Sequence, residues 1–163
     1  MNEIFIFGAK YLYILVLIIA LADFLRQSKN TKIRMIALAI IALPLTYVVS
    51  KILGYFYYDP RPFVQNHFLP LIPHDPDNGF PSDHAILVGA ISSVWFYFNK
   101  RLSFILWVIA ILVGVSRIAV GIHHPVDIIG GFIIAILCTV ISQKINQIKL
   151  FKKIKGGKPL SNI

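Results

Sequence analysis

Five apolar segments, separated by more polar stretches, constrain most strongly what this chain can fold into. They cover residues 4–25, 33–53, 85–98, 102–122 and 126–143. A helix of about 20 mostly apolar residues crosses the hydrocarbon core of a bilayer, and there it satisfies its own backbone hydrogen bonds. The segments therefore predict an all-α fold, a polytopic bundle of transmembrane helices with about five spans and six as the upper count.

The composition fits a single domain inside a membrane. Of the 163 residues, 57% are apolar and only 14% are charged, whereas a soluble domain is about 25% charged. A chain of this length leaves no room for a second domain. We interpret residues 1–163 as one integral-membrane domain, with its polar motifs between residues 51 and 127 and a basic tail at residues 144–163.

The net charge of +9 is spread unevenly along the chain. Lys and Arg gather at residues 26–34, at 100–101 and in the tail, so alternate connections between the apolar segments are basic. Such connections stay in the cytoplasm by the positive-inside rule. This places the loop at 59–81 and the turn at 123–125 outside the plasma membrane. We expect the tail to contact anionic lipid headgroups and not nucleic acid.

His123 and Asp127 lie four residues apart, where Pro125 suits the first turn of a helix. Asp127 would then accept a hydrogen bond from one imidazole nitrogen and leave the other as a nucleophile. The alternative is a His–Asp pair that only caps the helix. Arg117 ends the preceding apolar segment, and an arginine at the edge of a membrane segment is costly enough to indicate a functional site.

The segment F-P-S-D-H at residues 80–84 predicts the start of another helix, with Ser82 near its N-cap. Backbone N–H groups at a helix start attract anions, and His84 could donate a proton to a leaving oxygen. Lys51 and Arg61 add a mobile point charge and a planar guanidinium fork. Each residue alone has a simpler explanation, such as a lysine that reaches the interface. Together they indicate phosphoryl transfer without a metal.

The motifs K-x9-R-P, P-S-D-H and S-R-x5-H-x3-D resemble the three-part signature of the type-2 phosphatidate phosphatase and vanadium haloperoxidase superfamily. They are most similar to the bacitracin-resistance type of undecaprenyl diphosphate phosphatase, over about residues 50–131. The resemblance implies that His123 attacks the terminal phosphorus and becomes a phosphohistidine, while Asp127 orients it and His84 protonates the leaving group. It also implies that no metal or other cofactor is needed and that the phosphate oxygens are held by Lys51, Arg61, Ser82 and Arg117.

Two positions depart from the family pattern. The usual lysine lies seven residues before the arginine, where this chain has Gly54, and we expect Lys51, about one helical turn earlier, to take its place. The usual glycine of P-S-G-H is Asp83, which the bacitracin-resistance subgroup also carries. Because a carboxylate beside a phosphate is unfavourable, we expect Asp83 to point away or to stabilise the helix start. Asp83 and Pro62 are candidate accessory residues.

The resemblance implies that the substrate is a polyprenyl or other lipid phosphate, first of all undecaprenyl diphosphate, converted to undecaprenyl phosphate at the outer membrane face. A phosphatidate or phosphatidylglycerophosphate phosphatase is the alternative within enzymes. The alternative outside enzymes is a small transporter with a metal site built from loop residues, namely His67, His74, His123, His124, Asp75 and Asp77. No H-x3-H spacing occurs and nearby cations would repel a metal, so we favour the enzyme. For His67 and His74 we expect loop positions near the substrate entrance.

Overall fold

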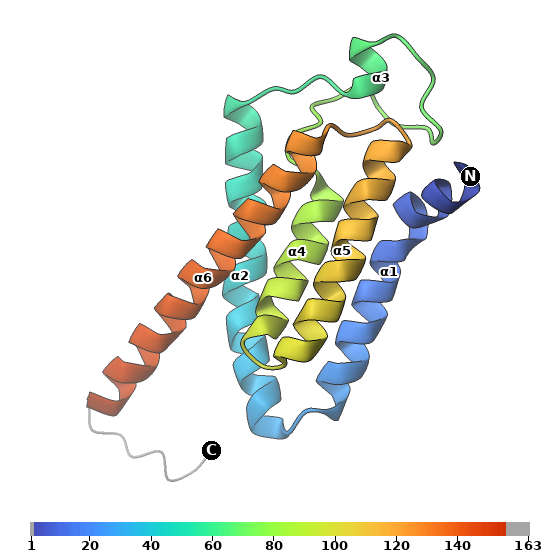
Figure 1. Cartoon of the computed structure of the whole chain (residues 1–163). Coiled ribbons are helices and arrows are strands. Elements are labelled where there is room, and N and C mark those ends of the chain that lie inside the picture. The colour runs from blue at the N-terminus through green and yellow to red at the C-terminus, as the bar shows by residue number, and fades with distance from the viewer. Residues whose placement is uncertain (1, 156–163) are drawn as a thin grey trace.

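The computed structural model describes residues 2–155, with side chains as far as residue 148. The helices are α1 (Asn2–Arg26), α2 (Lys29–Phe56), α3 (Pro62–Gln65), α4 (Asp83–Phe96), α5 (Lys100–Ala119) and α6 (Pro125–Lys155). They form an elongated bundle, with α3 in a loop above it (Figure 1). Within residues 2–155 there is no strand, only an isolated bridge between Pro60 and Asn78. The predicted all-α class is confirmed.

Four helices, α1, α2, α5 and α6, are long and apolar enough to cross a membrane. The fifth apolar helix, α4, has 14 residues, nine of them buried, and it packs against all four of the others. A helix shorter than a full span is tolerated there because most of its length is buried in protein and not exposed to lipid. The predicted segment at 85–98 therefore forms an apolar helix two residues earlier in the chain, and it is short of a full span. The last helix, in contrast, continues past residue 143 to Lys155.

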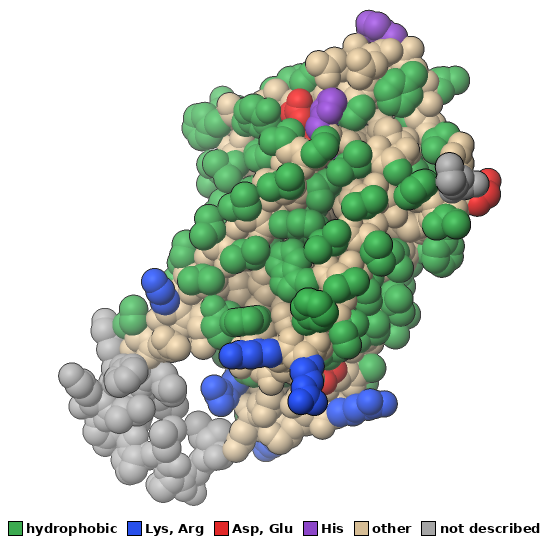
Figure 2. All heavy atoms as spheres, in the orientation of Figure 1, with side chains coloured by type: hydrophobic (Ala, Val, Ile, Leu, Met, Phe, Trp, Pro, Cys, Tyr) green, Lys and Arg blue, Asp and Glu red, His purple; other side chains and the backbone are tan. Residues whose placement is uncertain are grey.

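The outer flank of the bundle is apolar. Large exposed side chains such as Ile18, Ile40, Ile111 and Ile133 come from four different helices. Figure 2 shows hydrophobic side chains spread along the visible flank. The Lys and Arg side chains instead gather at one end (Figure 2), where the α1–α2 and α4–α5 connections lie (Figure 1). The chain is a multi-pass membrane protein with one basic end. Of the predicted basic tail, residues 156–163 lie outside the described residues.

Small residues let the helices approach closely, which is how helices associate without a hydrophobic driving force between them. Ala20, Val88 and Ala110 belong to one buried cluster that joins α1, α4 and α5. Gly114 on α5 is in contact range of Ile128 on α6, and a Cβ there would overlap the isoleucine side chain. The bundle therefore fixes the ends of α4, α5 and α6 relative to one another.

Asn78 organises the long loop at the other end of the bundle. Its Nδ2 donates to the carbonyl oxygens of Gly54 at 2.7 Å and Tyr57 at 3.0 Å. Its Oδ1 accepts from the backbone N–H groups of Asp59 at 2.9 Å and Phe80 at 3.0 Å. One side chain thus joins the end of α2 to both ends of the loop. The loop is fixed over the α5–α6 turn (Figure 1).

Candidate active site

Three helix ends bring the motif residues together. Ser82 is the N-cap of α4, as predicted, and Asp127 lies in the first turn of α6 behind Pro125, also as predicted. Arg117 lies in the last turn of α5. The backbone N–H of Ser82 donates to the carbonyl oxygen of Asp127 at 3.2 Å, so the starts of α4 and α6 are in direct contact.

His123 and Asp127 form the hydrogen bond expected from their spacing. Nδ1 of His123 lies 3.1 Å from Oδ2 of Asp127, and both side chains are buried. The same oxygen accepts from the backbone N–H of His124 at 2.8 Å. Because a carboxylate only accepts, Nδ1 carries the proton. The other ring nitrogen, Nε2, therefore keeps its lone pair and can act as a nucleophile.

Two guanidinium groups converge on that free nitrogen. One terminal nitrogen of Arg61 and one of Arg117 each lie 3.4 Å from Nε2 of His123. Arg61 also donates to Asp77 at 2.7 Å and to the carbonyl oxygen of Ile122 at 2.8 Å. Both arginines are only 5% exposed. Positive charge is therefore held where a phosphorus atom bonded to Nε2 would carry its oxygens.

The protonation of His123 follows from this geometry. Burial, and then the charges of Arg117 and Arg61, hold the pKa of His123 well below its ordinary value. The carboxylate of Asp127 acts in the opposite direction, but arginine N–H groups that point at Nε2 require an unprotonated nitrogen there. The imidazole is neutral at neutral pH, as a nucleophile needs to be.

A cavity of about 380 Å³ opens in front of Nε2. Its lining is largely polar and comes from α2, α4, α5, the long loop and the α5–α6 turn: Ser50, Lys51, Gly54, Arg61, His74, Asp77, Asn78, Phe80, Pro81, Asp83, His84, Arg117 and His123. The structure thus brings together five of the predicted phosphate-binding and catalytic side chains. His84, in the first turn of α4, packs edge-on against Tyr13 with ring centroids 4.8 Å apart. His84 lines the same cavity as His123 and is the candidate proton donor.

Asp83 does not point away from the site, which was one of the two placements expected for it. It lines the cavity, and its Oδ1 accepts a hydrogen bond from Nζ of Lys51 at 3.0 Å. The attraction of the lysine explains the difference, because the end of α2 lies across the cavity from the start of α4. The other half of the expectation is consistent with the structure, since Asp83 lies in the first turn of α4, where a negative charge stabilises a helix.

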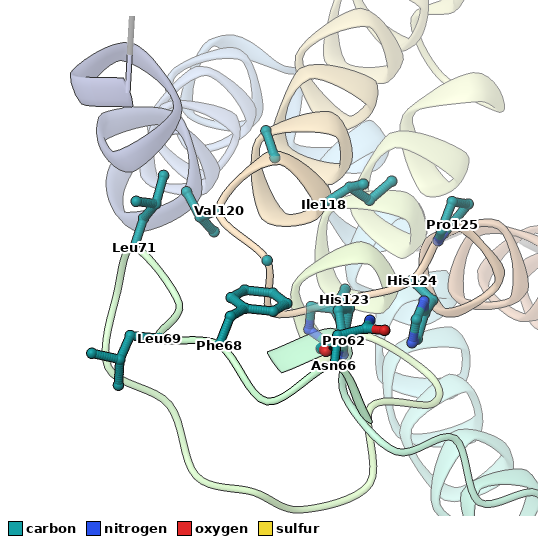
Figure 3. A pocket seen from close by; sticks show the side chains of 12 residues that line it. Pro62, Asn66, Phe68, Leu69, Leu71, Ile118, Val120, His123, His124 and Pro125 are labelled. Atoms are coloured by element: carbon teal, nitrogen blue, oxygen red, sulfur yellow. Dashed lines mark hydrogen bonds between the residues drawn. The ribbon is translucent and has the colours of Figure 1, made fainter. Parts of the chain in front are cut away.

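Ser82 and Pro62 lie at the edges of the site. Ser82 is fully buried and its Oγ has no hydrogen-bond partner, and it is absent from the lining of the polar cavity. Its phosphate-binding role stays a prediction. Pro62 begins α3 and lines a second cavity of about 470 Å³, which is mainly apolar and also borders His123 (Figure 3). In Figure 3, Phe68, Leu71 and Val120 surround this apolar cavity.

The sequence did not predict the roles of Asp77, which was named only as a possible metal ligand, and Asn78. Asp77 holds Arg61, and Asn78 holds the loop. The local signal was the turn-forming run D-P-D-N-G at 75–79. It indicates a turn, but it does not indicate which distant residues the side chains of that turn bind. His74 was placed near the entrance, and it lines the cavity with its ring 6.3 Å from that of His123. No group of three or more candidate metal ligands occurs in the described part of the chain.

Comparisons with known proteins agree with this arrangement. A family model described as the PAP2 superfamily matches residues 11–149. The undecaprenyl-diphosphatase BcrC of Bacillus subtilis is 34% identical over 140 residues, which cover 84% of this chain and 70% of that protein. Among solved structures, LpxE of Aquifex aeolicus superposes with a TM-score of 0.65 at 26% identity, covering 87% of this chain and 82% of the other.

A second solved structure has a similar fold. It is the transmembrane PAP2-type phosphatidylglycerolphosphate phosphatase of Bacillus subtilis, with a TM-score of 0.60 at 25% identity, covering 90% of this chain and 75% of the other. These matches confirm the resemblance drawn from the three motifs. The chain belongs to the PAP2 superfamily, and it is a lipid phosphatase and hence a hydrolase.

Proposed function

We propose that this protein removes the terminal phosphate of undecaprenyl diphosphate and releases undecaprenyl phosphate. The observation that carries the proposal is the convergence of Arg61 and Arg117 on the unprotonated Nε2 of His123. The likeness to BcrC, which covers most of both chains, supports this substrate. The apolar cavity beside His123 suits a substrate with a hydrocarbon chain next to its phosphates.

The reaction proceeds in two steps through a phosphohistidine. Nε2 of His123 attacks the terminal phosphorus, the P–O bond to the leaving phosphate breaks, and His84 donates a proton to that oxygen. Arg61, Arg117 and Lys51 neutralise charge on the phosphoryl oxygens, and Ser82 assists at the start of α4. Water then attacks the phosphohistidine, which returns His123 and releases inorganic phosphate. Asp127 keeps the imidazole in the required tautomer throughout.

The experiment measures phosphate release by purified protein in detergent that contains EDTA. Undecaprenyl diphosphate, phosphatidate and phosphatidylglycerophosphate are compared in parallel, with His123→Ala as the control. We expect fastest release from the diphosphate, no effect of EDTA, and no release by the variant. Preference for a glycerolipid would support the phosphatidylglycerophosphate alternative, for which the second solved structure is a precedent. A labelled protein adduct that is stable in base and lost in acid would identify the phosphohistidine.

We propose that the site faces the outside of the plasma membrane, because the opposite end of the bundle is basic. The only cysteine, Cys138, is buried, so a Cys138→Ser background permits single-cysteine labelling. An impermeant maleimide applied to intact cells should label Asp75→Cys in the loop and should not label Lys100→Cys. The reverse labelling pattern would place the active site in the cytoplasm.

A further inference from the structure

The buried carboxylate that orients His123 has one oxygen left over. Oδ2 of Asp127 accepts from His123 and from the backbone N–H of His124. Oδ1 of Asp127 is buried and has no hydrogen-bond partner. A buried carboxylate oxygen without a donor is costly. The Asp127 carboxylate therefore lacks one hydrogen-bond donor.

Asp59 lies near Asp127 and also has a carboxyl oxygen without a hydrogen-bond partner. Its Oδ2 is also buried and without a partner, and both residues border Gly79, close enough for the charge of Asp127 to raise the pKa of Asp59. Among the described residues, these are the two buried carboxyl oxygens that lack a donor. His124 does not supply one, because its Nε2 is itself buried without a partner.

The backbone fixes Asp59 in this position. Its N–H donates to Oδ1 of Asn78 at 2.9 Å, and its carbonyl oxygen accepts from the N–H of Gly79 at 2.9 Å. Gly79 has to be a glycine for this approach, since a Cβ there would lie 2.9 Å from Oδ2 of Asp127 and 3.2 Å from the carbonyl oxygen of Asp59. Asp59 is therefore held against Asp127 by the same loop that carries Arg61 into the site.

We propose that Asp59 is a protonated carboxylic acid that donates a hydrogen bond from Oδ2 to Oδ1 of Asp127, and so positions the Asp127–His123 pair. Two adjacent carboxyl groups that each bury an oxygen do not both ionise, so they hold one proton between them. That proton stays on Asp59, because the two N–H groups that bind Asp127 stabilise its charged form. Burial, and then the neighbouring charge of Asp127, raise the pKa of Asp59.

The consequence is a chain of three groups behind the nucleophile. Asp59 donates to Asp127, Asp127 accepts from Nδ1 of His123, and Nε2 is left to attack phosphorus. Asp59 touches neither substrate nor phosphate, so it is a positioning residue. Its loss should lower kcat and leave KM almost unchanged. This inference rests on the proposed function for its kinetic test, but the protonation of Asp59 is measurable without any substrate.

The first test is infrared spectroscopy of the full-length protein at neutral pH with isotope-labelled aspartate. We expect the C=O band of a protonated carboxylic acid in the wild type and its loss in Asp59→Asn. Asp75→Asn is the matched control, because Asp75 lies in the same loop and is exposed, and it should leave the band unchanged. A wild type without such a band, or a band that survives in Asp59→Asn, would overturn the proposal.

The second test is kinetic and uses phosphate release from undecaprenyl diphosphate. Asp59→Leu, which removes the donor, should lower kcat about tenfold to a hundredfold, the range expected for a lost hydrogen bond to a charged group. Asp59→Asn keeps a donor in the amide group and should recover most of that loss. Equal losses in the two variants, or a loss confined to KM, would refute the positioning role. An inactive wild type with the infrared band present would count against the proposed function and not against the protonated Asp59.

Discussion

The contact between Lys51 and Asp83 leads to a prediction about substrate affinity. If Lys51 replaces the family lysine, it has to leave Asp83 when phosphate binds. The ion pair is 3.0 Å long and its side chains are 53% and 68% exposed. Two charges at that distance attract by about 1.4 kcal/mol in bulk water, and the loss of side-chain freedom leaves a net of about 0.2–1 kcal/mol. Substrate binding has to overcome this amount.

Replacement of Asp83 by Asn removes that competition. We therefore expect Asp83→Asn to lower KM for undecaprenyl diphosphate by at most about fivefold, the factor that corresponds to 1 kcal/mol. Lys51→Met should raise KM, because it removes a cation from the cavity. Both values come from steady-state phosphate release in detergent at low ionic strength, since salt screens exposed charges.

A double-mutant cycle distinguishes two ways in which Asp83 could raise KM, by holding Lys51 in an ion pair or by repelling the substrate's phosphates directly. In the Lys51→Met background, Asp83→Asn should have little further effect on KM. If Asp83→Asn lowers KM equally in both backgrounds, its effect is repulsion alone and Lys51 does not exchange partners. If Asp83→Asn raises KM as much as Lys51→Met does, the carboxylate itself is required and the reasoning fails. Asp75→Asn controls for the loss of any negative charge on this face.

Three further predictions test separate parts of the site. His84→Ala should reduce kcat less on diphosphates than on monophosphate esters, because a leaving phosphate needs less help from an acid than an alkoxide does; equal losses would refute this role. Gly79→Ala should lower kcat about tenfold to a hundredfold, since its Cβ would lie 2.9 Å from Oδ2 of Asp127 and displace it; kcat within twofold of wild type would contradict this. Burial and the arginines lower the pKa of His123 in the folded protein, so below about pH 6.5 the unfolded chain binds a proton at this histidine and the folded protein does not. The free energy of unfolding should therefore decrease as the pH falls below about 6.5, by up to about 2 kcal/mol at pH 5. Thermal unfolding of His123→Asn should therefore depend less on pH between 7 and 5 than that of the wild type; equal dependence would refute it.

Local sequence signals were enough to predict the helix ends that form the site. These signals are local: Pro81 and Ser82 stand directly before α4, and Pro125 stands two residues before Asp127. The structure confirms both helix starts. Contacts between distant segments were not predictable in this way. Lys51 and Asp83 are 32 residues apart, and their pairing depends on how α2 lies beside α4. The roles of Asp59 and Asn78 likewise depend on how the loop folds back on the end of α2.

The carboxylates of the site divide into two kinds by their exposure. Asp77 and Asp83 hold Arg61 and Lys51 at the cavity, and their side chains are 63% and 68% exposed. Although partial burial alone would raise the pKa of Asp77, its hydrogen bond with Arg61 lowers it, so Asp77 is ionised. Water can solvate such carboxylates when a phosphate takes over their cations, so the exchange costs little. Asp127 is fully buried and has no such freedom. The exposed Lys51–Asp83 pair therefore suits reversible substrate binding, and the buried carboxylate suits the fixed orientation of the nucleophile.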